Sequence, residues 1–226
     1  MINQMFIYPI FPLLPLGNVS GVAYSDKETF LNFCASVIYL FAIHLLMRIA
    51  IKRTPAYEKN DKEMIVCHVL TFIASLAMVL MFGISDTLIK GTAFYLILLW
   101  ASVSDVHTRH LCDAASVMVV LVSFVGAEPK DLPSMILAAF FIGGMMFVCA
   151  MVSNNRLGGA DVKITAASAM VLGVWNTTAG LVVGLFIAVI HNLIKAKGKE
   201  KKTISFPLVP YLAIGFMVAF IFKGGI

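Results

Sequence analysis

The sequence predicts an all-α fold: a polytopic membrane helix bundle with about eight spans. Of the 226 residues, 60% are hydrophobic and only 13% are charged, and the mean hydropathy is +0.94. A soluble domain of this size has about 25% charged residues. The apolar residues also form runs separated by short polar loops, the pattern of helices that cross a hydrocarbon layer about 30 Å thick. The lipid bilayer is therefore an expected partner of this chain.

Eight apolar runs are predicted to be helices. The first has the length of about 20 residues that a hydrocarbon core requires. Several others are shorter, which suits helices whose polar ends lie in a protein-lined cavity. The predicted spans are 30–50, 64–82, 92–104, a short one ending near 126, 132–152, 161–174, 177–194, and one ending near 222.

The first 29 residues are predicted to be a non-spanning lead-in. They contain Pro9, Pro12 and Pro15, and prolines at this spacing remove helix hydrogen bonds. Residues 30–226 are expected to form a single transmembrane domain. No secretory signal peptide is expected, because nothing charged precedes the N-terminal apolar stretch.

The basic residues indicate the orientation of the spans. Counted over alternate loops, 13 of the 17 Lys and Arg residues lie in the odd-numbered loops, and the other 4 lie in the even-numbered loops and the termini. By the positive-inside rule, the odd-numbered loops face the cytoplasm. This arrangement accounts for the net charge of +5 without a nucleic-acid partner. Asp105 and Asp161 then both lie at the cytoplasmic face.

One short polar stretch interrupts two apolar runs. It contains Gly158, Gly159, Ala160, Asp161 and Lys163. An acid at the centre of a membrane helix costs about 3 kcal/mol and usually has a function. The two glycines allow another chain to approach closely, as a site for an extended peptide requires. An ordinary helix start capped by an acid has the same pattern, so both interpretations remain open.

Asp105 and Asp161 together supply the two carboxyl groups that aspartic peptide hydrolysis requires. One ionised carboxylate takes a proton from water, and the other, kept protonated, hydrogen-bonds the scissile carbonyl. Two like charges held close together do not both ionise easily, so such a pair shares one proton. The alternative is that each acid caps a helix and faces water.

The segments around both acids resemble the type IV prepilin peptidases, a family of Gly-x-Gly-Asp (GxGD) intramembrane aspartic proteases. The stretch from Gly158 to Lys163 matches the family's Gly-x-Gly-Asp-Val-Lys pattern, with Ala160 in place of the second glycine. Asp105 is followed by a basic residue at the family's offset, but Cys112 and Asp113 replace Pro and Asn.

A third match lies near the end of the chain. Residues 207–213 retain both prolines, Pro207 and Pro210, of a motif that precedes the family's last helix. The three matches occur in the family's order and cover about the C-terminal 120 residues. Their combination is more specific than any one of them.

The resemblance implies a prepilin leader peptidase with Asp105 and Asp161 as catalytic residues. We expect Gly158, Gly159, Ala160 and Lys163 to contact the substrate, with no metal and no cofactor. The implied substrate is a prepilin or pseudopilin of a type IV pilus or protein secretion system, cut where its basic leader meets its apolar helix. The implied location is the bacterial inner membrane, with multiple spans.

Larger members of the family carry paired cysteines and a methyltransferase activity. The first cytoplasmic loop here is only about a dozen residues long and has no Cys-x-x-Cys pair. The chain is therefore expected to be a short, peptidase-only form.

Other interpretations remain open at this point. Asp105 and Asp161 could serve a small membrane transporter coupled to protons or cations. His107 and His110, with Asp105 or Asp113, could bind a metal, because histidines three residues apart share a helix face. Ala160 could mark an inactive relative, and Asp113 could replace Asp105 as the partner of Asp161. Lys163 could bias the ionisation of the acids or simply set topology. The sequence does not predict the oligomeric state.

Overall fold

The computed structural model describes residues 26–53, 61–83, 85–109, 113–152, 158–196 and 207–223. Within these residues the secondary structure is entirely helical, which confirms the predicted all-α class. Five helices are long and apolar enough to cross a membrane, whereas α4 and α7 are shorter apolar helices. The elements are α1 (Asp26–Lys52), α2 (Asp61–Phe82), α3 (Asp86–Thr108), α4 (Asp113–Ser123), the short 3₁₀ turn η1 (Pro129–Asp131), α5 (Leu132–Val152), α6 (Gly159–Ala196) and α7 (Val209–Lys223).

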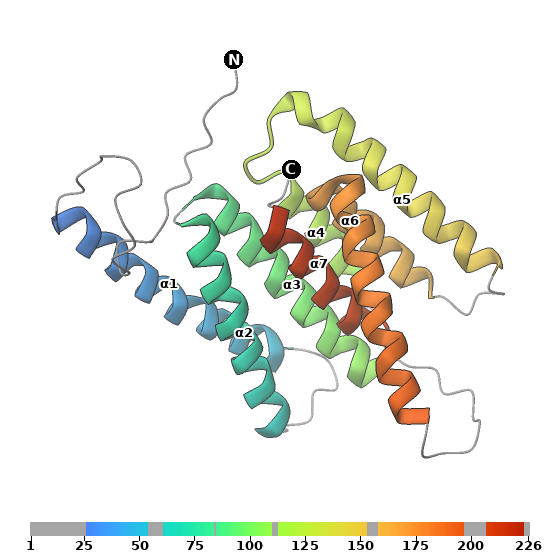
Figure 1. Ribbon diagram of the computed structural model, residues 1–226, viewed down its shortest axis with the longest axis horizontal. Helices are drawn as coiled ribbons and strands as arrows, with labels where there is room; N and C mark the ends of the chain where they lie inside the picture. Colours follow the sequence, from blue (N-terminus) through green and yellow to red (C-terminus); the bar gives the residue numbers. More distant parts are fainter. Residues whose placement is uncertain are drawn as a thin grey trace.

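Each predicted span corresponds to helical structure, although the boundaries differ. The predicted lead-in lies outside the described residues except for its last four, which begin α1 at Asp26. The sixth and seventh predicted spans form the two halves of α6, which Figure 1 shows folding back on itself. The bend is at Gly173, whose φ of 74° and ψ of 173° lie in a region that only glycine adopts readily. The predicted break, between residues 174 and 177, therefore lies slightly C-terminal to the observed bend.

Helix α3 is longer than predicted at both ends. Its N-terminus is capped by Ser85, whose hydroxyl accepts a 3.3 Å hydrogen bond from the Leu88 N–H. At the other end Arg109 adopts a left-handed conformation with φ of 54° and terminates the helix. Asp105 therefore lies in the last turn of α3, not immediately beyond a span as the sequence predicted. The helical backbone holds its side chain on one defined face.

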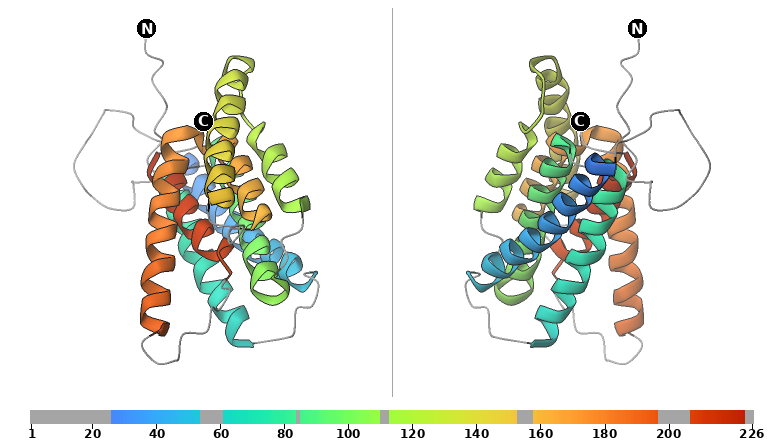
Figure 2. Two further views of the ribbon diagram at one scale, coloured as in Figure 1. Left: turned by 90° about the vertical axis from the view of Figure 1, so that its right-hand side faces the viewer. Right: turned by 90° about the vertical axis from the view of Figure 1, so that its left-hand side faces the viewer.

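Helix α7 and the first half of α6 are largely buried in the bundle, whereas the second half of α6 exposes apolar side chains. Helix α6 packs against α4, α5 and α7, and α7 packs against α3. Helix α1 contacts α2 and α3 and lies on the outside of the bundle, as Figure 2 shows. The fully buried rings of Phe94 in α3 and of Phe216 and Phe220 in α7 form the core between those two helices. This packing fixes the position of the α7 N-terminus against α3.

Three glycines bring α6 and α7 into close contact. A Cβ atom on Gly215 would lie 2.1 Å from the carbonyl oxygen of Gly180 and 2.7 Å from the nitrogen of Gly184. Small residues at such crossings allow membrane helices to pack backbone against backbone. The second half of α6 and the whole of α7 therefore form a tightly packed pair next to the polar ends described below.

Candidate active site

Asp105 projects from the last turn of α3 toward the start of α7. Its carboxylate Oδ2 accepts a hydrogen bond of 3.2 Å from the backbone N–H of Val209, the first residue of α7. The N–H of Leu208 also faces this carboxylate. The first N–H groups of a helix have no partner inside the helix and favour a negative charge. Asp105 thus satisfies the α7 N-terminus, and α7 holds the carboxylate in position.

Asp161 lies in the first turn of α6, where Gly158 precedes the helix. The Gly158 carbonyl accepts the Asp161 N–H at 3.0 Å, and the Gly158 N–H donates to the Asp161 carboxylate. This is the acidic half of a capping box. The helix-start interpretation of this stretch is therefore correct as a description of local structure. It does not exclude a second role for the same carboxylate.

The two acids come from different helices and interact electrostatically across the site. Both side chains are half-buried at the ends of their helices. Their charges therefore act on one another in partly desolvated surroundings, where the interaction is stronger than in water. Such a pair holds one proton more easily than none. The structure thus brings together the two residues that the sequence singled out, although they are 56 positions apart.

The other predicted site residues differ in their surroundings. No described atom lies within 4 Å of the position that a Cβ on Gly159 would occupy, so this side of the turn is open. Ala160 is half-buried in regular helix, and among described non-glycine residues only Arg109 has positive φ. The methyl group of Ala160 therefore causes no backbone strain.

Lys163 and Asp113 pair with each other. The Lys163 Nζ lies 2.9 Å from Asp113 Oδ1, and both side chains are exposed. This ion pair connects α6 to α4. The carboxyl group that interacts with Asp161 is that of Asp105, so the geometry favours Asp105 over Asp113 as its partner.

The histidines near the site do not form a metal centre with the described acids. His107 Nε2 lies 2.9 Å from Glu63 Oε2 of α2. Among the residues that the structure describes, no group of three or more His, Cys, Asp or Glu side chains could hold a metal ion. His110 lies outside the described residues.

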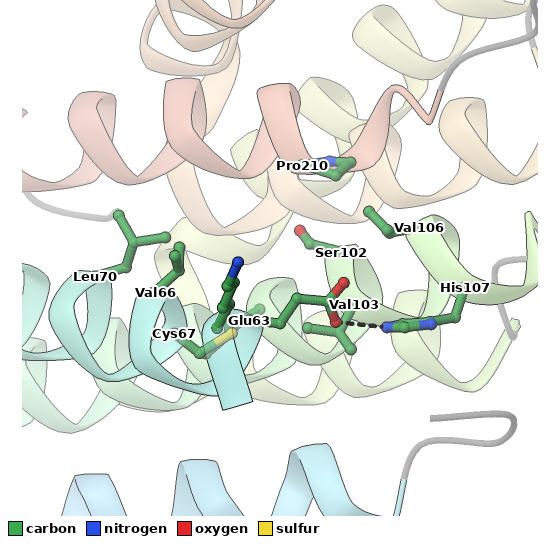
Figure 3. Close-up of a pocket in the computed structure, with 11 residues that line it drawn as sticks. Glu63, Val66, Cys67, Leu70, Ser102, Val103, Val106, His107 and Pro210 are labelled. Atoms are coloured by element: carbon green, nitrogen blue, oxygen red, sulfur yellow. Dashed lines mark hydrogen bonds and ion pairs between the residues drawn. The ribbon is translucent and has the colours of Figure 1, made fainter. Parts of the chain in front are cut away.

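A pocket of about 340 Å³ lies between α2, α3 and the start of α7, and its lining includes Val106, the residue that follows Asp105. Figure 3 shows Glu63, Val66, Cys67 and Leu70 lining it from α2, with Pro210 above. The wall formed by α3 includes Val103, Val106 and His107. Sequence reasoning missed this pocket and the contact from Val209 to Asp105. The only sequence signal near this contact was the pair of prolines, Pro207 and Pro210, on either side of Val209. They did not indicate that the Val209 N–H would bind Asp105.

Gly158 is expected to be necessary for the position of the Asp161 carboxylate. A Cβ on Gly158 would lie 3.0 Å from Asp161 Oδ2, which is closer than ordinary van der Waals contact. Displacing a reacting group by about 1 Å can reduce a rate by about 100-fold. We therefore expect Gly158→Ala to lower kcat by about 10- to 100-fold, measured in membranes as the rate of the leader removal that the sequence resemblance implies.

Gly144→Ala in α5 is the control for this substitution, because nothing lies within 4 Å of the position of its added Cβ. It should leave kcat within a few-fold of the wild-type value. Equal losses of kcat in the two variants would show that the contact with Asp161 does not explain the effect of Gly158→Ala.

The fold and the site define a class of protein: a polytopic helical membrane protein with two interacting acids at the ends of different helices. Residues 92–197, which include both acids, match the family model of the type IV leader peptidase family. Over this segment the chain is similar to that family.

One characterised protein with a similar sequence is the prepilin leader peptidase/N-methyltransferase of Bacillus subtilis (strain 168). The two are 25% identical over 151 residues, which is 64% of this chain and 60% of that protein. The chain therefore spans about 60% of the length of this relative. No solved structure matches the chain.

Proposed function

We propose that this protein is an aspartic endopeptidase that removes the leader peptides of type IV prepilins or pseudopilins. The observation that supports it most is the interaction of Asp105 with Asp161, two acids from different helices within the segment that matches the leader peptidase family. The proposed peptidase domain is 30–226, and its proposed location is the bacterial inner membrane.

The proposed reaction is general acid–base hydrolysis of one peptide bond. One carboxylate of the pair accepts a proton from a water molecule, whose oxygen forms a bond to the scissile carbonyl carbon. The protonated carboxyl group donates to the carbonyl oxygen as negative charge develops there. Collapse of the tetrahedral species breaks the C–N bond, and the leaving amine receives a proton from the pair. No metal and no cofactor takes part in these steps.

The surroundings of the acids support this assignment. The N–H groups of Val209 and Gly158 hold the carboxylates of Asp105 and Asp161 in place. The open side of the turn at Gly159 offers room for an extended substrate beside Asp161. We propose Gly158, Gly159, Ala160 and Lys163 as the residues along which the substrate backbone passes. An extended segment is suitable because a peptide bond inside a helix is shielded by its hydrogen-bonded neighbours.

The proposed substrate has a short basic leader in the cytoplasm and an apolar helix in the membrane. The distribution of Lys and Arg residues supports a cytoplasmic position for both acids, because 13 of 17 lie in loops on that side. A bond at the junction between leader and helix would then lie at the same depth as the acids.

The experiment is cleavage of a candidate prepilin in membranes that contain the wild-type protein, followed by the mobility of the pilin on a gel. Membranes with the double variant Asp105→Asn/Asp161→Asn are the blank. Loss of the leader only with the wild-type protein would support the proposal. If no prepilin or pseudopilin of the same genome is cut, and vesicles with wild-type protein show an ion flux that the double variant lacks, the transporter interpretation replaces it.

A further inference from the structure

We propose that the pocket between α2, α3 and the start of α7 binds the substrate at the junction of its leader and its apolar helix. In this proposal the apolar wall holds the first apolar side chains beyond the scissile bond. Glu63 pairs with a basic side chain of the leader. The inference rests on the proposed peptidase function and adds to it a specific recognition site.

The pocket is formed by two helix faces that meet each other only in part. On α2 the pocket is lined by Lys62 and by four residues at the spacing i, i+3, i+4 and i+7: Glu63, Val66, Cys67 and Leu70. Residues at this spacing share one face of a helix. On α3 the lining residues Leu99, Ser102, Val103 and Val106 follow the same spacing. Between these faces remains a space of about 340 Å³, large enough for several side chains.

The pocket and the acids share structural elements. Val106 lines the pocket and directly follows Asp105 on α3. Pro210 lines it from α7 and directly follows Val209, whose N–H binds the Asp105 carboxylate. A chain bound in the pocket would therefore contact the residues that follow Asp105 and Val209 in the sequence. This proximity favours a substrate over a lipid acyl chain as the occupant.

The chemistry of the lining also differs from one end to the other. Leu70 lies toward one end of the pocket, and the Glu63–His107 pair lies toward the other, as Figure 3 shows. Glu63 and Leu70 are seven residues apart on α2, which corresponds to about 10 Å along a helix. Lys62, the residue before Glu63, also lines the pocket and is exposed. The Glu63 side chain is 40% exposed, so its carboxylate can meet a further cation from solvent. A ligand that fits both ends has a cationic group followed by apolar side chains, which is the chemistry of the proposed junction.

Cross-linking tests binding without requiring cleavage. A photoreactive p-benzoyl-phenylalanine would replace Val66, and the protein would also carry Asp161→Asn so that the substrate stays intact. We expect a cross-linked product with a prepilin, at least fivefold more than from the same probe at Ile73. Ile73 lies on the exposed apolar surface of α2 and does not line the pocket. Equal yields at the two positions would overturn the proposal and indicate a lipid-facing groove.

Kinetics test the two ends of the pocket separately. Leu70→Trp would fill the apolar end and is expected to raise KM about tenfold, whereas Ile73→Trp should leave KM unchanged. Glu63→Gln retains a hydrogen-bond acceptor for His107 but removes the charge. It should raise KM about fivefold for a prepilin with a basic leader and not for one whose leader lysines and arginines are changed to glutamine. An unchanged KM in Leu70→Trp, or an equal effect of Glu63→Gln on both leaders, would overturn the proposal.

These results are separable from a failure of the proposed function. If the wild-type protein cuts no prepilin and the Val66 probe gives no product above that from Ile73, both proposals fall. If the wild-type protein cuts and the pocket variants behave as the wild type, only the pocket proposal falls.

Discussion

Replacing either Asp105 or Asp161 with Asn is expected to reduce the rate of leader removal by about 1,000-fold, the scale of a lost general acid or base. Asn has nearly the same shape as Asp, and its carbonyl oxygen can still accept the N–H of Val209 or of Gly158. The positions of the helices should therefore be preserved. What is lost is the ability to take up and return a proton. Since the two acids act as a unit, the double variant should be little slower than either single variant.

Asp113→Asn is the matched control for these two substitutions. Its side chain is exposed and its partner is Lys163. Exposed ion pairs of this kind contribute about 0–1 kcal/mol. We expect this variant to cleave within about threefold of the wild-type rate, in line with such a small contribution. The measurement is the initial rate of cleavage in membranes with equal amounts of each protein. A large loss in Asp113→Asn together with activity in Asp105→Asn would show that Asp113 is the partner of Asp161.

Gly215→Ala is expected to have the largest effect on stability. The added methyl group would lie 2.1 Å from the carbonyl oxygen of Gly180, and backbone atoms cannot rotate away as a side chain can. Helices α6 and α7 would have to separate. Overpacking a close-packed interior typically lowers the free energy of unfolding by about 1–3 kcal/mol. We expect Gly215→Ala to lower it by about 3 kcal/mol. Separation would also move the α7 N-terminus away from Asp105, so the remaining folded protein should cleave slowly.

Gly144→Ala in α5 is the control, because nothing lies within 4 Å of the position of its added Cβ. It should be neutral or slightly stabilising, since alanine favours helix more than glycine does. The measurement is thermal unfolding of both variants in the same detergent. If Gly215→Ala unfolds at the same temperature as Gly144→Ala, the close contact of α6 with α7 does not contribute to the stability of the fold.

The helical segments could be predicted well from the sequence because the bilayer imposes a local rule. Backbone N–H and C=O groups in hydrocarbon must find partners within the chain, so a long apolar run becomes a helix whatever its neighbours are. The ends of these helices were less predictable. Asp105 was expected just beyond a span and lies inside the last turn of α3, because Arg109 can adopt the left-handed conformation that ends the helix.

The candidate acids were also predictable, because an acid next to an apolar run is conspicuous and its motif is local. Their pairing depends on contacts between residues far apart in the chain. Asp105 meets Val209 across 104 positions, and Glu63 meets His107 across 44. No local pattern specifies such pairs.

The sequence by itself thus determined the membrane class, the helical segments, and the three motifs that resemble a leader peptidase. Only the tertiary structure decided that Asp105 interacts electrostatically with Asp161, that Asp113 pairs with Lys163, and that α2, α3 and the start of α7 leave a pocket between them. The physical reason is the range of the interactions. Helix formation depends on neighbours within about four residues, whereas a site depends on how the packing of α6 and α7 positions the ends of separate helices.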